Sequence, residues 1–128
     1  MGEAMIKVYI AGPYTKGDVA QNVRNAVRLA DYITQRGGFV VFIPHLTHFW
    51  HMLFPRPYEF WLAQDMEWLK VCDVVIRIEG DSSGADKEIA EAERLGIPWL
   101  SWGGFTLDEL SRLDKWLAGC EWKEVKSE

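Results

Sequence analysis

The segment Ile6-Lys-Val-Tyr-Ile-Ala11 is the stretch of sequence that decides the fold. It is short, rich in β-branched residues and stopped by Gly12-Pro13, so it predicts a β-strand. Asp18 and Gln21 then follow with the spacing of a capping box, which predicts the start of a helix that ends at Gly37-Gly38. The beginning of the chain is therefore expected to form a strand followed by a helix.

The same alternation continues along the chain. Four later segments have the composition of strands: Phe39–Ile43, Asp73–Ile78, Ile97–Ser101 and, at an edge, Glu121–Val125. Three other segments carry apolar residues at helical spacing: Tyr58–Cys72, about Gly84 to Leu95, and the leucine-rich segment after Thr106. Strands that are apolar on both faces and alternate with amphipathic helices predict a parallel sheet covered on both sides. The expected fold is a three-layer α/β sandwich, flavodoxin-like or Rossmann-like, with four or five mostly parallel strands.

The length and composition exclude several classes of protein. A chain of 128 residues has room for one domain, expected to span residues 1–128. The formal net charge of −5 disfavours a nucleic acid polymer as partner, because nucleic-acid binders usually carry a basic excess. No apolar run predicts a membrane span, and the N-terminus lacks the pattern of a secretory signal. A cytoplasmic protein that acts on small molecules is expected.

Aromatic residues gather in one part of the chain. It holds seven Trp, six Phe and four Tyr, and seven of these lie between Phe42 and Trp61. Residues 44–57 contain three prolines and no clear period, which is typical of a long functional loop. The aromatic residues form either a core beneath this loop or an apolar slot for a flat ligand such as a nucleobase.

Three histidines, His45, His48 and His51, stand three residues apart in the same segment. Zinc binding is disfavoured because loop spacing fixes no geometry and no fourth ligand is evident, so no metal site is predicted. One of the three is expected to line the ligand slot or to cap the following helix. We assign His45 to the slot, together with Trp61.

Two carboxylates fall on the apolar faces of predicted helices. Asp65 lies within a stripe of aromatic and apolar side chains, and Glu88 projects between the directions of Ala92 and Leu95. A carboxyl group that loses its hydration has a raised pKa, which a general acid needs. The alternatives are that Asp65 accepts hydrogen bonds from buried backbone groups and that Glu88 is a solvated helix residue.

Two loops follow predicted strands and precede helices, which is where open α/β sheets bind ligands. One is Asp81-Ser-Ser-Gly84, where a helix N-terminus favours anions, and its two serines either bind a ligand or cap the helix. The other runs from Gly12 to Gly17 and matches neither the Walker nor the dinucleotide-binding pattern. By itself the second loop is a weak signal for anion binding.

Taken together, these residues resemble the nucleoside 2-deoxyribosyltransferase-like superfamily, which includes the deoxynucleoside 5′-monophosphate N-glycosidases. The resemblance lies in Val8-Tyr-Ile-Ala-Gly-Pro13, Asp65, Asp73, Ser82-x-Gly84-x-x-x-Glu88 and Gly96-Ile-Pro98, and it covers residues 6 to about 100. It implies the strand order 2-1-3-4-5 and cleavage of the bond between a base and a (deoxy)ribose, by hydrolysis or by base transfer. No cofactor is implied.

The resemblance also implies roles for individual residues. Glu88 corresponds to the nucleophile that forms a covalent bond to the sugar, Asp65 to the acid that protonates or binds the departing base, and Tyr9 to the tyrosine that holds the nucleophile. With the residues of the slot, the expected substrate-binding set is Gly12, Pro13, Tyr14, Thr15, Lys16, Ser82, Ser83, Gly84, His45 and Trp61. The identity of the base and of the sugar stays open, as does the need for a 5′-phosphate.

A homodimer or higher homo-oligomer is expected. Family members often assemble with a neighbour that closes each active site, and Leu110, Leu113, Trp116 and Leu117 offer more apolar surface than one sheet edge needs. Two rival functions stay open at this point. One is a non-catalytic module that binds nucleotides on the same fold, and the other is a structural α/β domain whose aromatic residues contact a partner.

Overall fold

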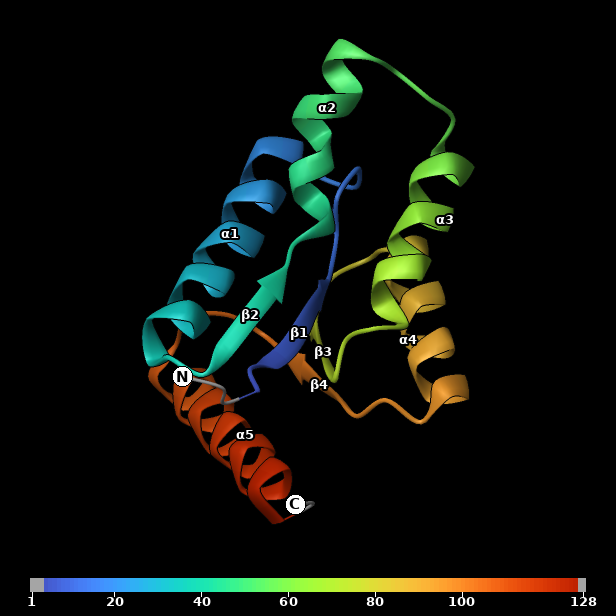
Figure 1. Ribbon diagram of the computed structural model, residues 1–128. Helices are drawn as coiled ribbons and strands as arrows, with labels where there is room; N and C mark the ends of the chain where they lie inside the picture. The colour runs from blue at the N-terminus through green and yellow to red at the C-terminus, as the bar shows by residue number, and fades with distance from the viewer. Residues whose placement is uncertain (1–3, 127–128) are drawn as a thin grey trace.

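The four strands form one parallel sheet in the order β2-β1-β3-β4 (Figure 1). The computed structural model describes residues 4–126, with the strands at β1 (Ile6–Ala11), β2 (Phe39–Phe42), β3 (Val74–Ile78) and β4 (Trp99–Trp102). Val8 of β1 pairs with Val41 of β2 on one side and with Val74 of β3 on the other. The expected α/β class is confirmed, and the order agrees with the first four positions of the expected series.

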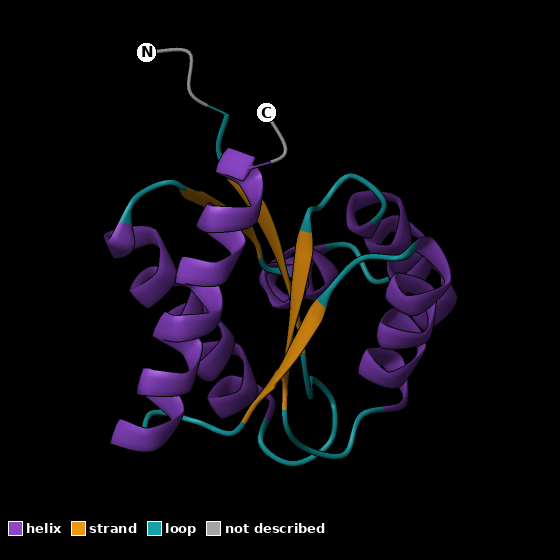
Figure 2. Cartoon of the chain, turned by 90° about the horizontal axis from the view of Figure 1, so that it is seen from below, coloured by secondary structure: helices purple, strands orange, loops and turns teal. Residues whose placement is uncertain are grey.

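Helices cover both faces of this sheet (Figure 2). The helical elements are α1 (Val19–Arg36), the 3-10 turn η1 (Pro44–Leu46), α2 (Thr47–Leu53), α3 (Tyr58–Leu69), α4 (Ser83–Leu95) and α5 (Leu107–Lys126), of which α1, α3, α4 and α5 pack on the sheet. On one face, α1 and α5 bury residues such as Leu29 and Leu113 against Val8 and Ile76. On the other, α3 and α4 bury Leu69 and Ala92 with others against Tyr9 and Val75. Burial on both faces explains why the central strands are apolar throughout.

The expected edge strand at Glu121–Val125 is wrong, because these residues belong to α5. The helix begins after Thr106, whose Oγ1 accepts a hydrogen bond from the backbone N–H of Glu109. Leu113 and Leu117 are fully buried and anchor the helix on the sheet. Once a helix is nucleated, each further residue costs little, and no proline stands between Leu107 and the strand-like residues to stop it.

The segment 44–57 is not the irregular loop that its sequence indicates. It forms η1 and α2, which project beyond the carboxyl ends of β1 and β2 (Figure 1). No residue of α2 is buried, so its sequence carries no apolar period. Within residues 4–126, no helix has the length and apolar content needed to cross a membrane.

Candidate functional site

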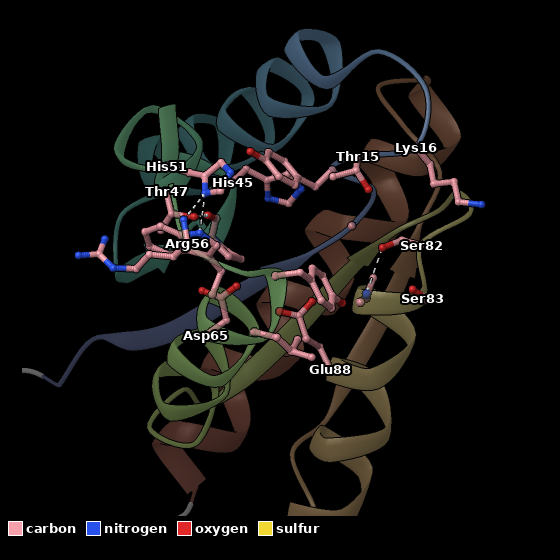
Figure 3. A pocket seen from close by; sticks show the side chains of 18 residues that line it. Thr15, Lys16, His45, Thr47, His51, Arg56, Asp65, Ser82, Ser83 and Glu88 are labelled. Atoms are coloured by element: carbon pink, nitrogen blue, oxygen red, sulfur yellow. Dashed lines mark hydrogen bonds between the residues drawn. The ribbon is translucent and has the colours of Figure 1, made fainter. Parts of the chain in front are cut away.

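A cavity of about 300 Å³ lies at the carboxyl end of the sheet. The loops after β1, β2 and β3 line it together with α3 and α4, as the side chains in Figure 3 illustrate. Eleven residues of the expected site take part: Gly12, Tyr14, Thr15, Lys16, His45, Trp61, Asp65, Ser82, Ser83, Gly84 and Glu88. Sequence reasoning therefore located most of this cavity.

Two residues of the expected site do not line the cavity. Pro13 packs instead against the loop after β3, where Gly80 has a φ of 138° and a Cβ would lie 2.6 Å from Pro13 Cγ. Its contribution is its carbonyl oxygen, to which the ring of His45 hydrogen-bonds. Tyr9 lies beneath the cavity in β1 and reaches it only through Glu88.

Glu88 is a buried carboxyl group in α4, with a hydrogen bond from the hydroxyl of Tyr9 to its Oε2. The pKa of Glu88 is raised to about 8, chiefly by burial; the hydrogen bond from Tyr9 opposes this rise, the nearby Asp65 adds to it, and the charge of Arg77 lowers it. Burial, and then the charge of Glu88, also raises the pKa of Tyr9 far above its ordinary value. Tyr9 therefore keeps its proton and acts as a permanent donor to Glu88, which is not the solvated residue of the alternative interpretation.

Asp65 faces the same cavity from α3. Burial raises the pKa of its carboxyl group to about 7. Its Oδ1 is buried and has no hydrogen-bond partner among the described residues. No backbone group of the described residues donates to Oδ1, contrary to the alternative in which buried backbone groups hold Asp65. A buried polar atom without a partner is costly, so this atom is suited to bond with a ligand.

His45 is 4 % exposed and lines the cavity from η1. Its Nε2 lies 3.0 Å from the carbonyl oxygen of Pro13, which can only accept, so the proton is on Nε2. Burial lowers the pKa of His45, and hydrogen bonds to the backbone at Pro13 and Gly12 oppose this only in part. The ring is thus neutral, and its buried Nδ1 is an acceptor without a partner.

His51 has the same tautomer for a different reason. Its Nδ1 accepts hydrogen bonds from Trp61 Nε1 at 2.8 Å and from the backbone N–H of Arg56 at 3.3 Å. These bonds, drawn dashed in Figure 3, leave Nε2 to carry the proton as a donor. His48 instead pairs with the hydroxyl of Tyr14. Among the described residues, no group of three or more His, Cys, Asp or Glu is placed to hold a metal ion.

Sequence reasoning missed seven residues of the cavity: Pro44, Thr47, His51, Arg56, Tyr58, Leu62 and Ala85. Tyr58 and Leu62 precede Asp65 by seven and three residues, so helical spacing could have found them. His51 belongs to the series of three histidines, of which only His45 was assigned to the slot. Arg56 follows α2, the helix without a buried face, and no sequence pattern marks it. Of the seven aromatic residues between Phe42 and Trp61, only Tyr58 and Trp61 line the cavity. Most of the seven therefore belong neither to a buried core nor to a slot for a ligand.

Three comparisons relate this chain to known proteins. The structure is similar to that of a 2-deoxyribosyltransferase from the psychrotolerant bacterium Bacillus psychrosaccharolyticus, described as a biocatalyst for the synthesis of nucleosides. The TM-score is 0.56 and the identity 21 %, over 76 % of this chain and 72 % of that chain, so the likeness establishes a shared fold. No curated protein sequence matches this chain. A family model described as a domain of unknown function, DUF7768, matches residues 6–101, and the chain therefore belongs to that family.

Proposed function

We propose that this protein cleaves the N-glycosidic bond of a nucleoside or a nucleoside 5′-monophosphate. We further propose that it belongs to the nucleoside 2-deoxyribosyltransferase-like superfamily. The observation that carries the proposal is the buried carboxyl group of Glu88, held by the hydroxyl of Tyr9 in a cavity that Asp65 also lines. The fold shared with a 2-deoxyribosyltransferase supports it at the level of architecture.

The chemistry requires two carboxyl groups in different protonation states, with Glu88 ionised and Asp65 protonated. Because the pKa of Glu88 is raised to about 8 and that of Asp65 to about 7, this is the less populated of the two singly protonated forms. Ionised Glu88 attacks the anomeric carbon, and the bond from that carbon to the base nitrogen breaks. The electron pair of this bond stays on the base, which takes a proton from Asp65. The sugar is now an ester of Glu88. Water or a second base then attacks the same carbon and gives a proton to the carboxylate of Asp65, and the ester bond to Glu88 breaks, which restores the carboxylate of Glu88.

The walls of the cavity suit the two parts of such a substrate. Trp61 and Tyr58 offer flat apolar surfaces to a base, and Asp65 and His45 offer polar atoms that lack partners. In Figure 3, Glu88 lies between Asp65 on one side and Ser82 with Ser83 on the other. The base would then lie near Asp65, and the 5′ end of the sugar near the two serines.

The direct test is incubation of the protein with each common nucleoside and its 5′-monophosphate, followed by chromatography for free base. We expect base release from at least one compound. The variant Glu88→Gln should lower kcat by about 1,000-fold while the protein stays folded, because the amide is not a nucleophile. Addition of a second free base to the reaction separates hydrolysis from transfer, since only transfer yields a new nucleoside.

A matched control is Glu93→Gln, which makes the same change on the exposed side of α4 and should keep full activity. Base release by Glu88→Gln at the rate of the unmodified protein would remove Glu88 from the role of nucleophile. Tight binding of a nucleotide without any base release would favour the rival function, a non-catalytic binding module.

A further inference from the structure

Residues 44–53 form η1 and α2, and their histidines join this helical segment to the walls of the cavity. His45 Nε2 lies 3.0 Å from the carbonyl oxygen of Pro13, and His48 Nδ1 pairs with the hydroxyl of Tyr14. Both contacts reach the loop after β1. No residue of α2 is buried, so little apolar burial holds this helix in place.

His51 makes the third attachment, which reaches α3. Its Nδ1 accepts hydrogen bonds from Trp61 Nε1 at 2.8 Å and from the backbone N–H of Arg56 at 3.3 Å. Figure 3 shows His51 and Arg56 at the end of the cavity away from Lys16. Among the residues that the structure describes, the three histidines make every side-chain hydrogen bond that joins residues 44–53 to the rest of the chain. The segment is therefore fastened on two sides of the cavity.

The contact with His51 also orients Trp61, which is 9 % exposed and lines the cavity. The rings of Trp50 and Phe60 meet the indole edge to face, each with a centroid distance of 5.1 Å. This packing limits where the indole lies, whereas the hydrogen bond from Nε1 fixes which edge of it faces α2. His51 thus sets the orientation of a flat surface that the cavity offers to a base.

The attachment at His51 exists only while Nδ1 carries no proton. An indole N–H and a backbone N–H can only donate, so a protonated Nδ1 would face two donors. Histidine is the side chain that ordinarily changes its charge between pH 5 and 8. The attachment to α3 is therefore present when the ring is neutral, and it is lost as the pH falls and the ring takes up a proton.

The two attachments to the loop after β1 do not share this dependence. Burial lowers the pKa of His45, so its ring stays neutral and Nε2 keeps its proton. Burial raises the pKa of Tyr14, so its hydroxyl keeps its proton and can donate to a neutral His48 or accept from a protonated one. In acid, residues 44–53 are thus released from α3 and stay attached to the loop after β1.

Other charged or titratable groups also line the cavity. They are Lys16 from the loop after β1, Arg56 after α2, Tyr58 and Asp65 from α3, and Glu88 from α4. The pKa of Asp65 is raised to about 7 and that of Glu88 to about 8, chiefly by burial, so both take up protons as the pH falls. Among the described residues, neither carboxyl group hydrogen-bonds to residues 44–53, so their loss of charge breaks none of the attachments.

From these contacts we infer that the three histidines are positioning residues that fasten residues 44–53 across the cavity, and that a proton on His51 releases the segment from α3. The attachment itself does not depend on the proposed reaction. Its effect on KM rests on the proposed function, because that effect acts through the orientation of Trp61 toward a base.

Hydrogen exchange, followed by mass spectrometry on the full chain without substrate, tests the attachment. After correction for intrinsic exchange rates, the amides of residues 47–57 should exchange about 10-fold faster at pH 5 than at pH 7.5, because two hydrogen bonds are lost. His51→Phe keeps a planar ring without an acceptor and should show the fast exchange at both pH values. His51→Asn keeps a side-chain acceptor that does not titrate, so it should show slow exchange at both.

Two control variants separate His51 from its surroundings. Met52→Phe places an aromatic ring at an exposed neighbouring position of α2 and should behave like the unmodified protein. Asp65→Asn removes the carboxyl group that titrates in the same range and should keep the pH response. Exchange of the β1 amides shows whether each variant is folded. If His51→Phe does not fold, the unmodified protein and His51→Asn decide the inference between them.

Equal exchange at pH 7.5 in the unmodified protein and in a folded His51→Phe would overturn the inference. A pH response that persists in His51→Asn, or one that disappears in Asp65→Asn, would also overturn it. With any compound that releases base, His51→Phe should raise KM about fivefold and His51→Asn should restore it. Absence of base release from every compound would count against the proposed function, and the exchange measurements would still decide the inference.

Discussion

At the scale of single residues, the proposed chemistry depends on which of two buried carboxyl groups holds a proton. Glu88 must be ionised to attack, and Asp65 must be protonated to donate. Burial raises the pKa of Glu88 to about 8 and that of Asp65 to about 7, so the two titrate as a coupled pair. The reactive form is one of two singly protonated states. We therefore expect a bell-shaped dependence of kcat/KM on pH, with its maximum near neutrality.

Tyr9→Phe tests this pair because it removes the hydrogen bond that lowers the pKa of Glu88. The pKa of Glu88 should rise by about one to two pH units, as expected for the loss of a bond to a charged group. The sum of the two apparent pKa values of the coupled pair rises by the same amount as the pKa of Glu88. The pH optimum of kcat/KM should therefore move upward by about half of that shift, whichever group loses its proton first.

The maximum value of kcat/KM should also fall in Tyr9→Phe, because Glu88 then keeps its proton in a larger share of the singly protonated molecules. Tyr32→Phe is the matched control. It removes a tyrosine hydroxyl that donates to Asp114 on the opposite face of the sheet, so the optimum should stay in place. An optimum that stays in place or moves to lower pH in Tyr9→Phe would contradict the assigned role of Tyr9.

At the scale of elements, the approach of α3 to α4 shapes the cavity. A Cβ at Gly84 would lie 2.7 Å from Oη of Tyr58, so glycine allows the tyrosine to lie against the first turn of α4. Gly84→Ala should displace the ring of Tyr58, which is half exposed and free to move outward. We expect KM to rise about fivefold, while the free energy of unfolding changes by less than about 1 kcal/mol.

Two further variants sharpen this test. Gly119→Ala makes the same change in α5, where a Cβ meets no side chain that the structure describes within 4 Å, and it should stabilise the protein by about 0.5–1 kcal/mol without any change in KM. Adding Tyr58→Phe to Gly84→Ala removes the clashing oxygen and leaves the ring carbon at an ordinary 3.8 Å. In the double variant, KM should return close to the value of the unmodified protein. A KM that stays high would show that the defect of Gly84→Ala does not come from the contact with Tyr58.

The sequence was informative about elements wherever one face of an element is buried. The capping-box spacing of Asp18 and Gln21 predicted the start of α1, where the structure shows Asp18 accepting from the N–H of Gln21. The leucines at helical spacing after Thr106 predicted α5, and Thr106 accepts from the N–H of Glu109 at its start. Asp65 and Glu88 could be singled out because helical spacing places them among apolar residues. The helix α2 could not be predicted, because none of its residues is buried and no period results.

At the scale of the whole molecule, the alternation of strands and helices predicted the parallel sheet and a site at its carboxyl end. It could not predict how residues 44–57 contribute to that site. His45 is placed by the carbonyl oxygen of Pro13, and His51 by the N–H groups of Trp61 and Arg56. Contacts of this kind depend on how segments pack in space, and they leave no spacing in the sequence.

The expectation of a homo-oligomer needs a different argument in light of the structure. Leu113 and Leu117 are buried in the core of the chain itself, so α5 does not offer them to a partner. Exposed apolar side chains gather instead on and just after α2: Phe49, Trp50, Met52, Leu53 and Phe54. Contiguous apolar surface of this kind marks an interaction site in most soluble proteins. The surface of α2, adjacent to the cavity mouth, is therefore the surface through which we expect two copies to associate.

Light scattering at micromolar concentration should give a mass at least twice the 14.7 kDa of one chain. Phe49→Asp with Leu53→Lys places two charges on the α2 surface and should shift the protein toward the monomer, because burial of each charge at an interface costs more than the contact gains. The control is Leu107→Lys on α5, a position that is even more exposed, at 86 %, and it should leave the mass unchanged. A mass of one chain for the unmodified protein, unchanged by added nucleoside, would show instead that the α2 surface faces solvent in a monomer.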